Sequence, residues 1–399
     1  MLVTKEKLLI RIRAAEARDA SRIKEIYESV FGVEGVKAPG HEAYPAPDMF
    51  SEQGVLRVIE DPHRELLVID KEDTIAGGMV IHKLGPYHVE FACVAIAPEF
   101  RGLGLSPKML AQAKAQANDS ILTLNNTEIV THSIYSQCAH ARAGYNKVTG
   151  FNFCQYPRVF FKDHEESCSW VSSIDGKVAE LLEASKKCGK HNPPDFKFES
   201  DEERQLFQAL SSERPVYLPE NLKDLVDLIL SQFAEQICYK TFIAKSDEDA
   251  PTNSYCAPYK EIYLDEQEGE PFTYLYLPGE MEDRWQAKID SLLEKAQNTS
   301  GKHYIQARLS ANFPATIEYA RYLEEKGFVI MGLLPLYNLE KENASGEVRF
   351  GDALVLQWIE PSVLERNQLP GDTDSVPKLH SLPLGINGAL IKTMRRQYS

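Results

Sequence analysis

A glycine-rich turn at residues 101–106, Arg-Gly-Leu-Gly-Leu-Ser, is the stretch of this chain with the clearest chemical character. Glycines allow positive φ angles and let the backbone approach a ligand closely. A helical pattern begins around Pro107, and the first N–H groups of a helix have no partner within it. Because the helix dipole and Arg101 add positive potential, the turn predicts a binding site for a pyrophosphate.

The elements that must position this turn are a buried strand before it and an amphipathic helix after it. Residues 88–97, HVEFACVAIA, are apolar and rich in β-branched and aromatic side chains, with Glu90 as the one carboxylate. Met109, Leu110 and Ala113 recur at helical spacing after the turn. The sequence therefore predicts a strand–turn–helix unit. It lacks the GKS or GKT of a P-loop and does not match the dinucleotide fingerprint.

This unit resembles motif A of the GNAT acyl-CoA N-acetyltransferases, whose pattern is Q/R-x-x-G-x-G/A after a strand ending in proline. The matching residues are Val94, Ile96, Pro98, Phe100, Arg101, Gly102, Gly104 and Ser106. Serine at the last position departs from Gly or Ala but is small. The resemblance implies acetyl-CoA as cosubstrate. It implies contacts to the pantetheine and pyrophosphate from Val94, Ile96, Arg101, Gly102, Leu103, Gly104, Leu105 and Ser106.

The predicted elements of the first half follow the order of the GNAT fold. We expect an α/β protein of the α+β GNAT type, in which helices flank a mixed central sheet. Strands are expected at residues 8–14, 66–70, 74–82, 88–97, 128–132 and 151–161. In this family the motif A strand and the next strand, here 128–132, splay apart and the cofactor lies between them. Aromatic residues within 32–54, including Tyr44 and Phe50, are candidates for a wall of the acceptor site.

A helix predicted at residues 136–149 is similar to the family's motif B, N-x-x-A-x-x-x-Tyr-x-x-x-Gly-Phe. With Gly150-Phe151 as its end, Tyr145 lies five residues before Gly150 rather than four. One residue corresponds to about 100° of helix rotation. Tyr145 is the candidate general acid that returns a proton to the CoA thiolate, and Tyr135 is the alternative.

Acetyl transfer to an amine needs a base that removes the ammonium proton. Glu90 is the candidate, because burial in an apolar strand would raise its pKa toward neutrality, and GNAT enzymes commonly place a glutamate on this strand. His132, at the end of the next strand, is the rival base. The sequence contains neither the G-x-S-x-G of a serine hydrolase nor an HExxH metal motif, so no metal is expected.

The second half repeats the pattern of the first, and Glu325-Lys326-Gly327-Phe328 is close to the end of a motif B. Where the phosphate turn should stand, residues 277–283 read Leu-Pro-Gly-Glu-Met-Glu-Asp, with one glycine and three carboxylates that would repel a pyrophosphate. We predict a degenerate GNAT-like domain without cofactor. The predicted division is a GNAT domain at 1–161, an extension or linker at 162–214, the second domain at 215–360 and a tail at 361–399.

The bulk composition restricts the partners. A formal charge of −15 argues against nucleic acid or an anionic membrane as the main partner. The seven cysteines show no CxxC or metal-ligand spacing, which suits a reducing compartment. The N-terminus lacks the apolar core of a signal peptide, and no apolar run reaches the ~18 residues of a membrane helix. We expect a cytoplasmic protein.

The sequence thus favours an N-acetyltransferase that moves the acetyl group of acetyl-CoA to a primary amine by direct attack with general-base assistance. The acceptor is a small-molecule or peptide amine whose identity the sequence leaves open. An alternative is a non-catalytic acyl-CoA sensor, which would tolerate the loss of Glu90 and Tyr145. A third alternative is a structural module in which the second domain mediates assembly, and a homodimer is left open.

Overall fold

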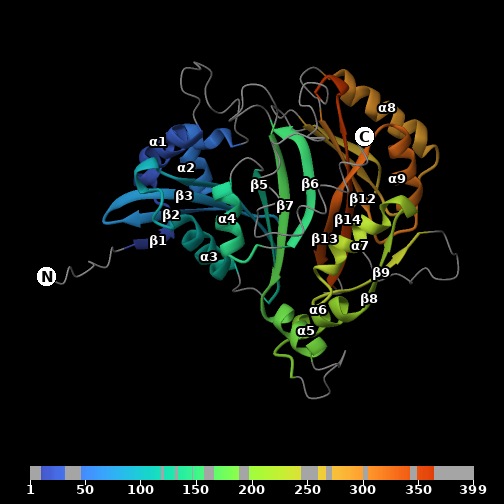
Figure 1. The fold of residues 1–399 in the computed structure, drawn as a ribbon, viewed down its shortest axis with the longest axis horizontal. Helices are drawn as coiled ribbons and strands as arrows, with labels where there is room; N and C mark the ends of the chain where they lie inside the picture. The colour runs from blue at the N-terminus through green and yellow to red at the C-terminus, as the bar shows by residue number, and fades with distance from the viewer. Residues whose placement is uncertain are drawn as a thin grey trace.

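A single twelve-stranded mixed sheet dominates the computed structural model of the protein (Figure 1). The structure describes residues 10–31, 46–117, 121–130, 134–145, 147–156, 166–187, 197–243, 259–266, 272–299, 304–341 and 348–363. The strands follow the order β1-β2-β3-β4-β5-β7-β6-β13-β14-β12-β11-β10, so that the first seven come from one half of the chain and the last five from the other. The predicted class, a mixed sheet flanked by helices, is confirmed.

The first half places two pairs of helices on opposite faces of its strands. The strands are β1 (Ile10–Ala14), β2 (Arg64–Lys71), β3 (Thr74–Lys83), β4 (His88–Ile96), β5 (Thr123–Val130), β6 (Lys147–Tyr156) and β7 (Glu166–Asp175). Helices α1 (Ala20–Phe31) and α2 (Glu52–Glu60) share one core with the alternate residues Leu66 and Val68 of β2. Helix α3 (Leu105–Ala117) packs on Leu67 and Ile69 of the other face, and α4 (Ile134–Arg142) lies beside α3.

The second half has the same strand order as the centre of the first. Its strands are β10 (Tyr263–Glu266), β11 (Phe272–Leu277), β12 (Tyr304–Ser310), β13 (Val329–Lys341) and β14 (Val348–Ile359). The order β10-β11-β12-β14-β13 corresponds to β3-β4-β5-β7-β6, and β11/β12 is a parallel pair like β4/β5. Helices α8 (Trp285–Asn298) and α9 (Ala315–Glu325) follow β11 and β12, as α3 and α4 follow β4 and β5.

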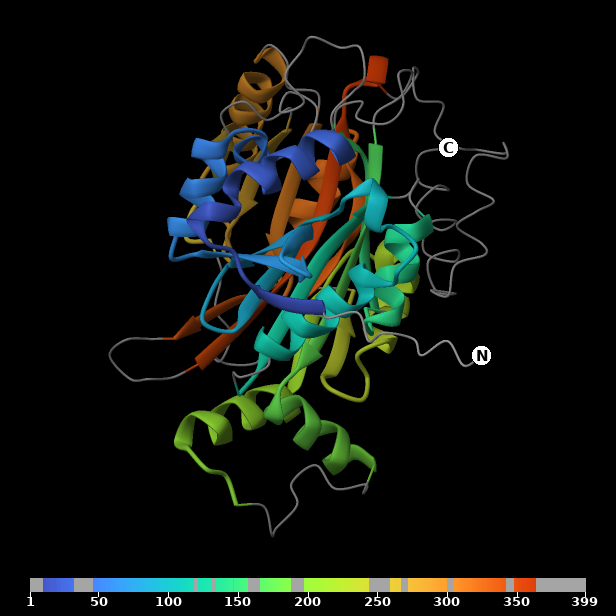
Figure 2. The same cartoon turned by 90° about the vertical axis from the view of Figure 1, so that its left-hand side faces the viewer.

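The segment between the halves contains two helices and a small βαβ unit. Helices α5 (Lys177–Lys187) and α6 (Asp201–Ser211) pack on each other and project from one end of the molecule (Figure 2). They are followed by β8 (Glu213–Tyr217), α7 (Lys223–Ser231) and β9 (Cys238–Phe242), and β8 and β9 form a parallel two-stranded sheet. No helix in the described part of the chain is both long and apolar enough to cross a bilayer.

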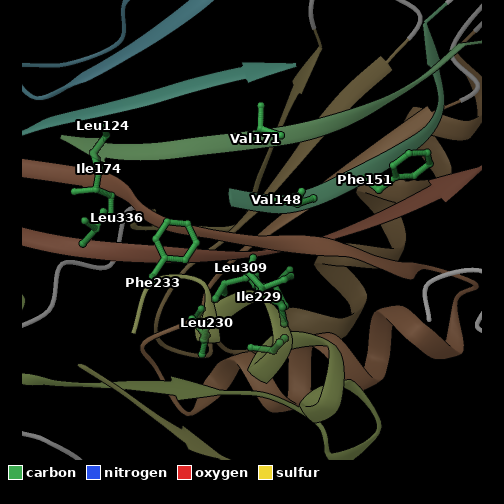
Figure 3. Close-up of a cluster of buried hydrophobic side chains, with 14 of the residues drawn as sticks. Leu124, Val148, Phe151, Val171, Ile174, Ile229, Leu230, Phe233, Leu309 and Leu336 are labelled. Carbon is green, nitrogen blue, oxygen red and sulfur yellow. The ribbon is translucent and has the colours of Figure 1, made fainter. Parts of the chain in front are cut away.

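The two halves meet where β6 lies against β13. Gly150 of β6 is opposite Gly332 of β13, and a Cβ atom at Gly332 would lie 2.2 Å from the Thr149 carbonyl oxygen and 2.5 Å from the Gly150 Cα. Only glycine permits this approach, so the pair of glycines makes the two sheets continuous. One hydrophobic core contains Val148 of β6, Val171 of β7 and Phe233, which lies shortly after Ser231 in the sequence (Figure 3).

Two glutamines that follow α7 tie the segment between the halves to the first half. The Gln232 amide donates to the Val148 carbonyl oxygen at 2.8 Å, and its Oε1 accepts from the Val148 N–H at 2.8 Å. Gln236 Nε2 donates to the Ile174 carbonyl oxygen at 2.8 Å. These bonds satisfy backbone groups of β6 and β7 that would otherwise be buried without partners. This segment is therefore fixed to the first half by hydrogen bonds as well as by apolar packing.

The predicted helix at 136–149 is wrong at its C-terminus. Helix α4 ends at Arg142, and Gly144 takes φ +89° directly after it. The Tyr145 N–H donates to the His140 carbonyl oxygen at 3.0 Å, which is the bond of a glycine-terminated helix. This segment contains two glycine–aromatic pairs, Gly144-Tyr145 and Gly150-Phe151, and the first of them ends the helix. Strand β6 accordingly begins at Lys147 rather than at the predicted Phe151.

The segment 162–214, predicted as an extension or linker, instead contributes a strand to the centre of the sheet. Strand β7 lies between β5 and β6 and pairs with the whole of β5, from Val130↔Cys168 to Thr123↔Asp175. Its sequence, ESCSWVSSID, carries serines on both faces of the strand, so its alternation gives little hydrophobic signal. The tail beyond residue 363 lies outside the described residues.

A buried ion pair joins β8 to β14. Arg214 and Asp352 are 1% and 0% exposed, and the Arg214 guanidinium lies 3.2 Å from the Asp352 carboxylate. That carboxylate also accepts from Asn312 Nδ2 at 2.7 Å and from the Leu336 N–H at 2.7 Å. Because the pair is fully desolvated, removing one member leaves the other charged and buried.

Arg214→Met should lower the free energy of unfolding by about 3–5 kcal/mol, because the Asp352 carboxylate would lose its cation. Urea denaturation followed by tryptophan fluorescence measures this. The matched control is Arg321→Met, since exposed Arg321 lies 3.6 Å from Glu318 on α9 and such a pair contributes at most about 1 kcal/mol. Equal losses in the two variants would contradict the role assigned to the buried pair.

Candidate active site

The predicted strand–turn–helix unit is present, with β4 ending at Ile96 and α3 beginning at Leu105. Gly102 and Gly104 have φ angles of +78° and +68°, in the region that favours glycine. A Cβ atom added at either glycine would have no neighbour within 4 Å. The turn therefore faces open space, and the N–H groups that open α3 are available to a ligand on this side.

The charges around the turn suit an anion. Arg101 is exposed, and its Nε lies 3.4 Å from the Ile96 carbonyl oxygen. The first turn of α3 contains no acidic residue, and Lys108 is exposed near its start. Leu103 and Ser106 complete the turn, and the 45% exposure of Leu103 leaves an apolar side chain beside the helix start. Binding of a pyrophosphate at residues 101–106 stays a prediction, and the geometry of the turn is compatible with it.

Strands β4 and β5 part after three residue pairs. The parallel pairing covers His88↔Leu124 to Glu90↔Asn126, while β4 continues to Ile96. Thr127 Oγ1 bridges the start of the separation by donating to the Phe91 carbonyl oxygen at 2.7 Å. The splay expected from the family resemblance is thus present. It leaves the backbone of β4, including Val94 and Ile96, without a strand partner on its β5 side among the described residues.

A bulge in β4 lies at the same place. The pairing with β3 shifts between Val80↔Ala92 and Gly78↔Ala95, and Cys93 has φ +56°. The Tyr27 hydroxyl of α1 holds this conformation by donating to the Cys93 carbonyl oxygen. A bulge turns backbone groups away from the regular ladder. It therefore changes the direction of the β4 backbone next to Val94.

Glu90 lies at the point where β4 and β5 part. It is opposite His82 on β3 and Asn126 on β5, and its side chain is half-buried. Burial is the main cause that raises the pKa of Glu90 to about 7, the nearby Glu128 carboxylate adds to the rise, and the Arg308 charge opposes it. A carboxylate with this pKa accepts a proton effectively near neutral pH.

His88 is held neutral beside Glu90. Burial, with a smaller effect of Arg308, lowers the pKa of His88 to about 4. Asn126 Nδ2 lies 2.5 Å from His88 Nε2, and the Ser172 hydroxyl donates to Asn126 Oδ1 at 2.6 Å. Because Oδ1 accepts, Nδ2 is the donor to His88. His88 therefore accepts at Nε2 and adds no positive charge beside Glu90 at neutral pH.

Tyr145 is fully buried, and its hydroxyl has no hydrogen-bond partner within the described part of the chain. Its ring packs edge-on against Phe91 and His140, with centroid distances of 5.9 and 5.8 Å. Burial raises the pKa of Tyr145 well above its ordinary value. A hydroxyl in this environment is a weak proton donor, so its predicted role as general acid stays untested and gains no support from this geometry.

The corrected end of α4 changes the register of motif B. Gly144 corresponds to Gly327, which also ends its helix with a positive φ of +85°. Counted from Gly144, the residue at the tyrosine position of the family pattern is His140. Its Nδ1 lies 2.8 Å from the Ser136 carbonyl oxygen, and burial lowers the pKa of His140 to about 4. His140 is therefore neutral at pH 7.

Three of the predicted side chains lie outside the described part of the chain. His132, the rival base, lies outside the described residues, as does Tyr44 of the predicted acceptor wall. The side chain of Tyr135 lies outside them as well, although its backbone belongs to α4. Phe50 of that wall is half-buried in the core beneath α1 and α2.

The corresponding place in the second half is closed. Strands β11 and β12 stay paired from Phe272↔Tyr304 to Leu277↔Leu309 and do not splay over this length. A Cβ atom at Gly279 would lie 2.6 Å from the Phe313 ring, and the Tyr319 hydroxyl donates to the Glu280 carbonyl oxygen at 3.0 Å. Side chains thus occupy the turn that in the first half faces open space.

Arg308 is a residue near the site that the sequence analysis missed. Its charge acts on both Glu90 and His88, although more than two hundred positions separate them in the sequence. A local signal existed, because Arg308 is the one charged residue of β12, YIQARLS, as Glu90 is the one charged residue of β4. In the described part of the chain, no group of three or more His, Cys, Asp or Glu residues converges as metal ligands would.

Comparison with known families identifies the first half. Residues 22–151 match the model of the acetyltransferase (GNAT) family. This match confirms the resemblance found in motif A for this part of the chain, which is a GNAT acetyltransferase domain. The second half is not covered by the match. A comparison with curated proteins gave no match to this chain.

Solved structures that match part of this chain include proteins described as acetyltransferases. The yncA protein of Salmonella typhimurium, with its cofactor acetyl-CoA, has 18% sequence identity and a TM-score of 0.34, covering 41% of this chain and 93% of its own. A phosphinothricin acetyltransferase from Sinorhizobium meliloti in complex with acetyl-CoA has 20% identity and a TM-score of 0.34, covering 42% and 89%. Spermidine N-acetyltransferase from Vibrio cholerae, with CoA and spermine, has 15% identity and a TM-score of 0.32, covering 42% and 95%.

Proposed function

We propose that this protein transfers the acetyl group of acetyl-CoA to a primary amine. The observation that carries the proposal is Glu90, half-buried with a pKa of about 7 where β4 and β5 part, on the strand that leads into the open glycine turn. In this proposal the pyrophosphate binds at residues 101–106 and α3. The pantetheine runs along β4 past Val94 and Ile96, so that the thioester lies toward Glu90.

The proposed chemistry is direct attack. Glu90 takes a proton from the ammonium group of the acceptor, and the free amine nitrogen attacks the acetyl carbonyl carbon. The carbonyl carbon–sulfur bond breaks, and CoA leaves as a thiolate. The nitrogen loses its second proton to solvent as the amide forms, and the thiolate takes a proton from solvent or from Tyr145, the candidate general acid. Backbone N–H groups of β4 beyond the splay are the candidate donors to the carbonyl oxygen. The thioester supplies the activated acetyl group, and the protein supplies orientation and the base.

A thiol-release assay tests this function. The full chain is incubated with acetyl-CoA and a panel of polyamines, amino acids, amino sugars, lysine peptides and peptides with free N-termini, and free CoA is measured against a control without acceptor. Acceptor-dependent CoA release, with the acetylated amine found by mass spectrometry, supports the proposal. Tight acetyl-CoA binding without acetylation of any amine would instead support the alternative of an acyl-CoA sensor.

Calorimetric titration should give one acetyl-CoA site per chain. The reason is that the turn at residues 277–283 is filled by Phe313 and bonded to Tyr319, and its carboxylates would repel a pyrophosphate. Titration with CoA at several protein concentrations measures the stoichiometry. Two equivalent sites per chain would refute the proposal that the second half is a GNAT-like domain without cofactor.

A further inference from the structure

The second half carries an aromatic sheet face next to the first half. Side chains on β11 and β12 alternate between two faces. Leu275 and Ile305 lie in the core with α8 and α9, whereas Tyr274, Tyr276 and Arg308 lie on the opposite face and keep part of their surface accessible. A ligand can therefore reach these three side chains.

Arg308 lies at the centre of this face. Its guanidinium is 4.3 Å from the ring centre of Tyr274 and 5.0 Å from that of Tyr337. Its Nε donates to Gln306 Oε1 at 2.8 Å, and its Nη1 donates to the Tyr337 hydroxyl. We call Arg308, Tyr274, Tyr276 and Tyr337 the Arg308 cluster. These contacts fix the orientation of the guanidinium through stacking and hydrogen bonds.

The Arg308 cluster is adjacent to the proposed reaction site. The His88 ring lies edge-on to Tyr337 with a centroid distance of 5.8 Å. The positive charge of Arg308 lowers the pKa of Glu90 and of His88, so the guanidinium lies within electrostatic range of both. A small acceptor could thus place one end at Glu90 and the other at Arg308.

The charge of Arg308 is not neutralised in the way that other arginines of this protein are. Arg13 lies 2.7 Å from the Asp19 carboxylate and Arg214 lies 3.2 Å from that of Asp352. Among the described residues, no carboxylate lies within 4.0 Å of the Arg308 guanidinium, and the side chains that contact it are tyrosines and Gln306. Removing a guanidinium from water without a carboxylate partner costs free energy, and an anionic ligand that binds beside it offsets that cost.

We propose that the Arg308 cluster binds a carboxylate of the acceptor, so that the substrate is an amine that also carries an acid group, such as an amino acid. This inference rests on the proposed acetyl transfer, with Glu90 receiving the amine proton. The planar guanidinium matches the two oxygens of a carboxylate. The second half, without a cofactor of its own, would then supply the part of the acceptor site that selects the substrate.

Paired amines that differ only in the carboxylate test this inference. The pairs are phenylalanine with phenethylamine, arginine with agmatine, and alanine with ethylamine, and the other standard amino acids complete the panel. Both kcat/KM for acetylation and the Kd for binding to the CoA-loaded full chain are measured. We expect the amino acid of at least one pair to be preferred by about 10- to 100-fold, the usual loss when a hydrogen bond to a charged group is removed.

Two variants and one control test whether Arg308 causes the preference for the amino acid over its paired amine. Arg308→Gln should bring the ratio of kcat/KM between the amino acid and its paired amine close to one. Arg308→Lys keeps the charge but not the planar guanidinium group, so it should give an intermediate ratio. Arg321→Gln, at an exposed arginine on α9, should keep the wild-type ratio. Circular dichroism and melting temperatures show whether each variant is folded. A purely structural role of Arg308 would not change the ratio.

The outcomes separate this inference from the proposed function. Acetylation of amines with a ratio near one in the wild type would overturn the inference and leave the transferase function in place. Binding that depends on the carboxylate and on Arg308, without acetylation, would keep the inference and overturn the function. Failure of every amino acid to bind or react, or preference for O-phosphoethanolamine over all of them, would overturn a carboxylate site.

Discussion

A glutamate in place of Gly104 should weaken acetyl-CoA binding by at least about 100-fold. The substitution puts a negative charge where the helix dipole and Arg101 favour an anion, so the new carboxylate would repel the diphosphate. Gly104 has φ +68°, so any L side chain there adds about 1–2 kcal/mol of backbone strain. Calorimetric titration of the purified variant with acetyl-CoA measures the loss.

The fold should survive this change, because a Cβ atom at Gly104 would meet nothing within 4 Å. Gly104→Ala is the matched control, since it adds the same backbone strain without charge or bulk, and it should retain more affinity than the glutamate variant. If Gly104→Glu is folded and binds acetyl-CoA as tightly as the wild type, the pyrophosphate does not bind at this turn.

Local signals in the sequence predicted the centre of the first half well. The strand at 88–97 and the helix after Pro107 depend on apolar periodicity and on two closely spaced glycines, all within thirty residues. The structure places the elements there, as β4 and α3. Glu90 was found for the same reason, because one carboxylate stands out in an apolar strand.

Signals that depend on distant parts of the chain were missed. Strand β7 is hidden by its serines, which face other polar groups such as Asn126 across the strands, and its position between β5 and β6 follows from pairing that no local pattern specifies. The end of α4 was misplaced because Gly144-Tyr145 and Gly150-Phe151 are equally good local signals for the end of a helix. The proximity of Arg308 to Glu90 depends on the seam at Gly150 and Gly332, which joins two segments far apart in sequence.

Glu90→Gln should lower kcat by about 10²- to 10⁴-fold, the usual effect of removing a general base. Glutamine keeps the size and hydrogen-bonding capacity of the side chain but cannot accept the ammonium proton. The loss should appear in kcat far more than in the Kd for acetyl-CoA, because the carboxylate acts mainly in the transition state. Steady-state kinetics with the best acceptor, together with calorimetry, separate the two effects.

The pH dependence of kcat should identify the same group. A base must be ionised, so the wild-type kcat should rise with pH through the Glu90 pKa of about 7, and Glu90→Gln should lose this inflection. Glu128→Gln is an informative control, because the Glu128 carboxylate helps to raise the Glu90 pKa and its removal should move the inflection to lower pH. At high pH the deficit of Glu90→Gln should shrink, since more of the amine is already neutral.

The raised pKa also predicts an effect on stability that does not depend on the reaction. Between the ordinary value of 4.5 and about 7, folded Glu90 holds its proton more tightly than unfolded Glu90, so the wild-type free energy of unfolding should fall as pH rises through this window. Glu90→Gln should lack this decrease and become more stable relative to the wild type at pH 8 than at pH 4. Loss of the stability difference together with a near-wild-type kcat at neutral pH would remove Glu90 as the base, and His132→Gln would then be the first variant to test.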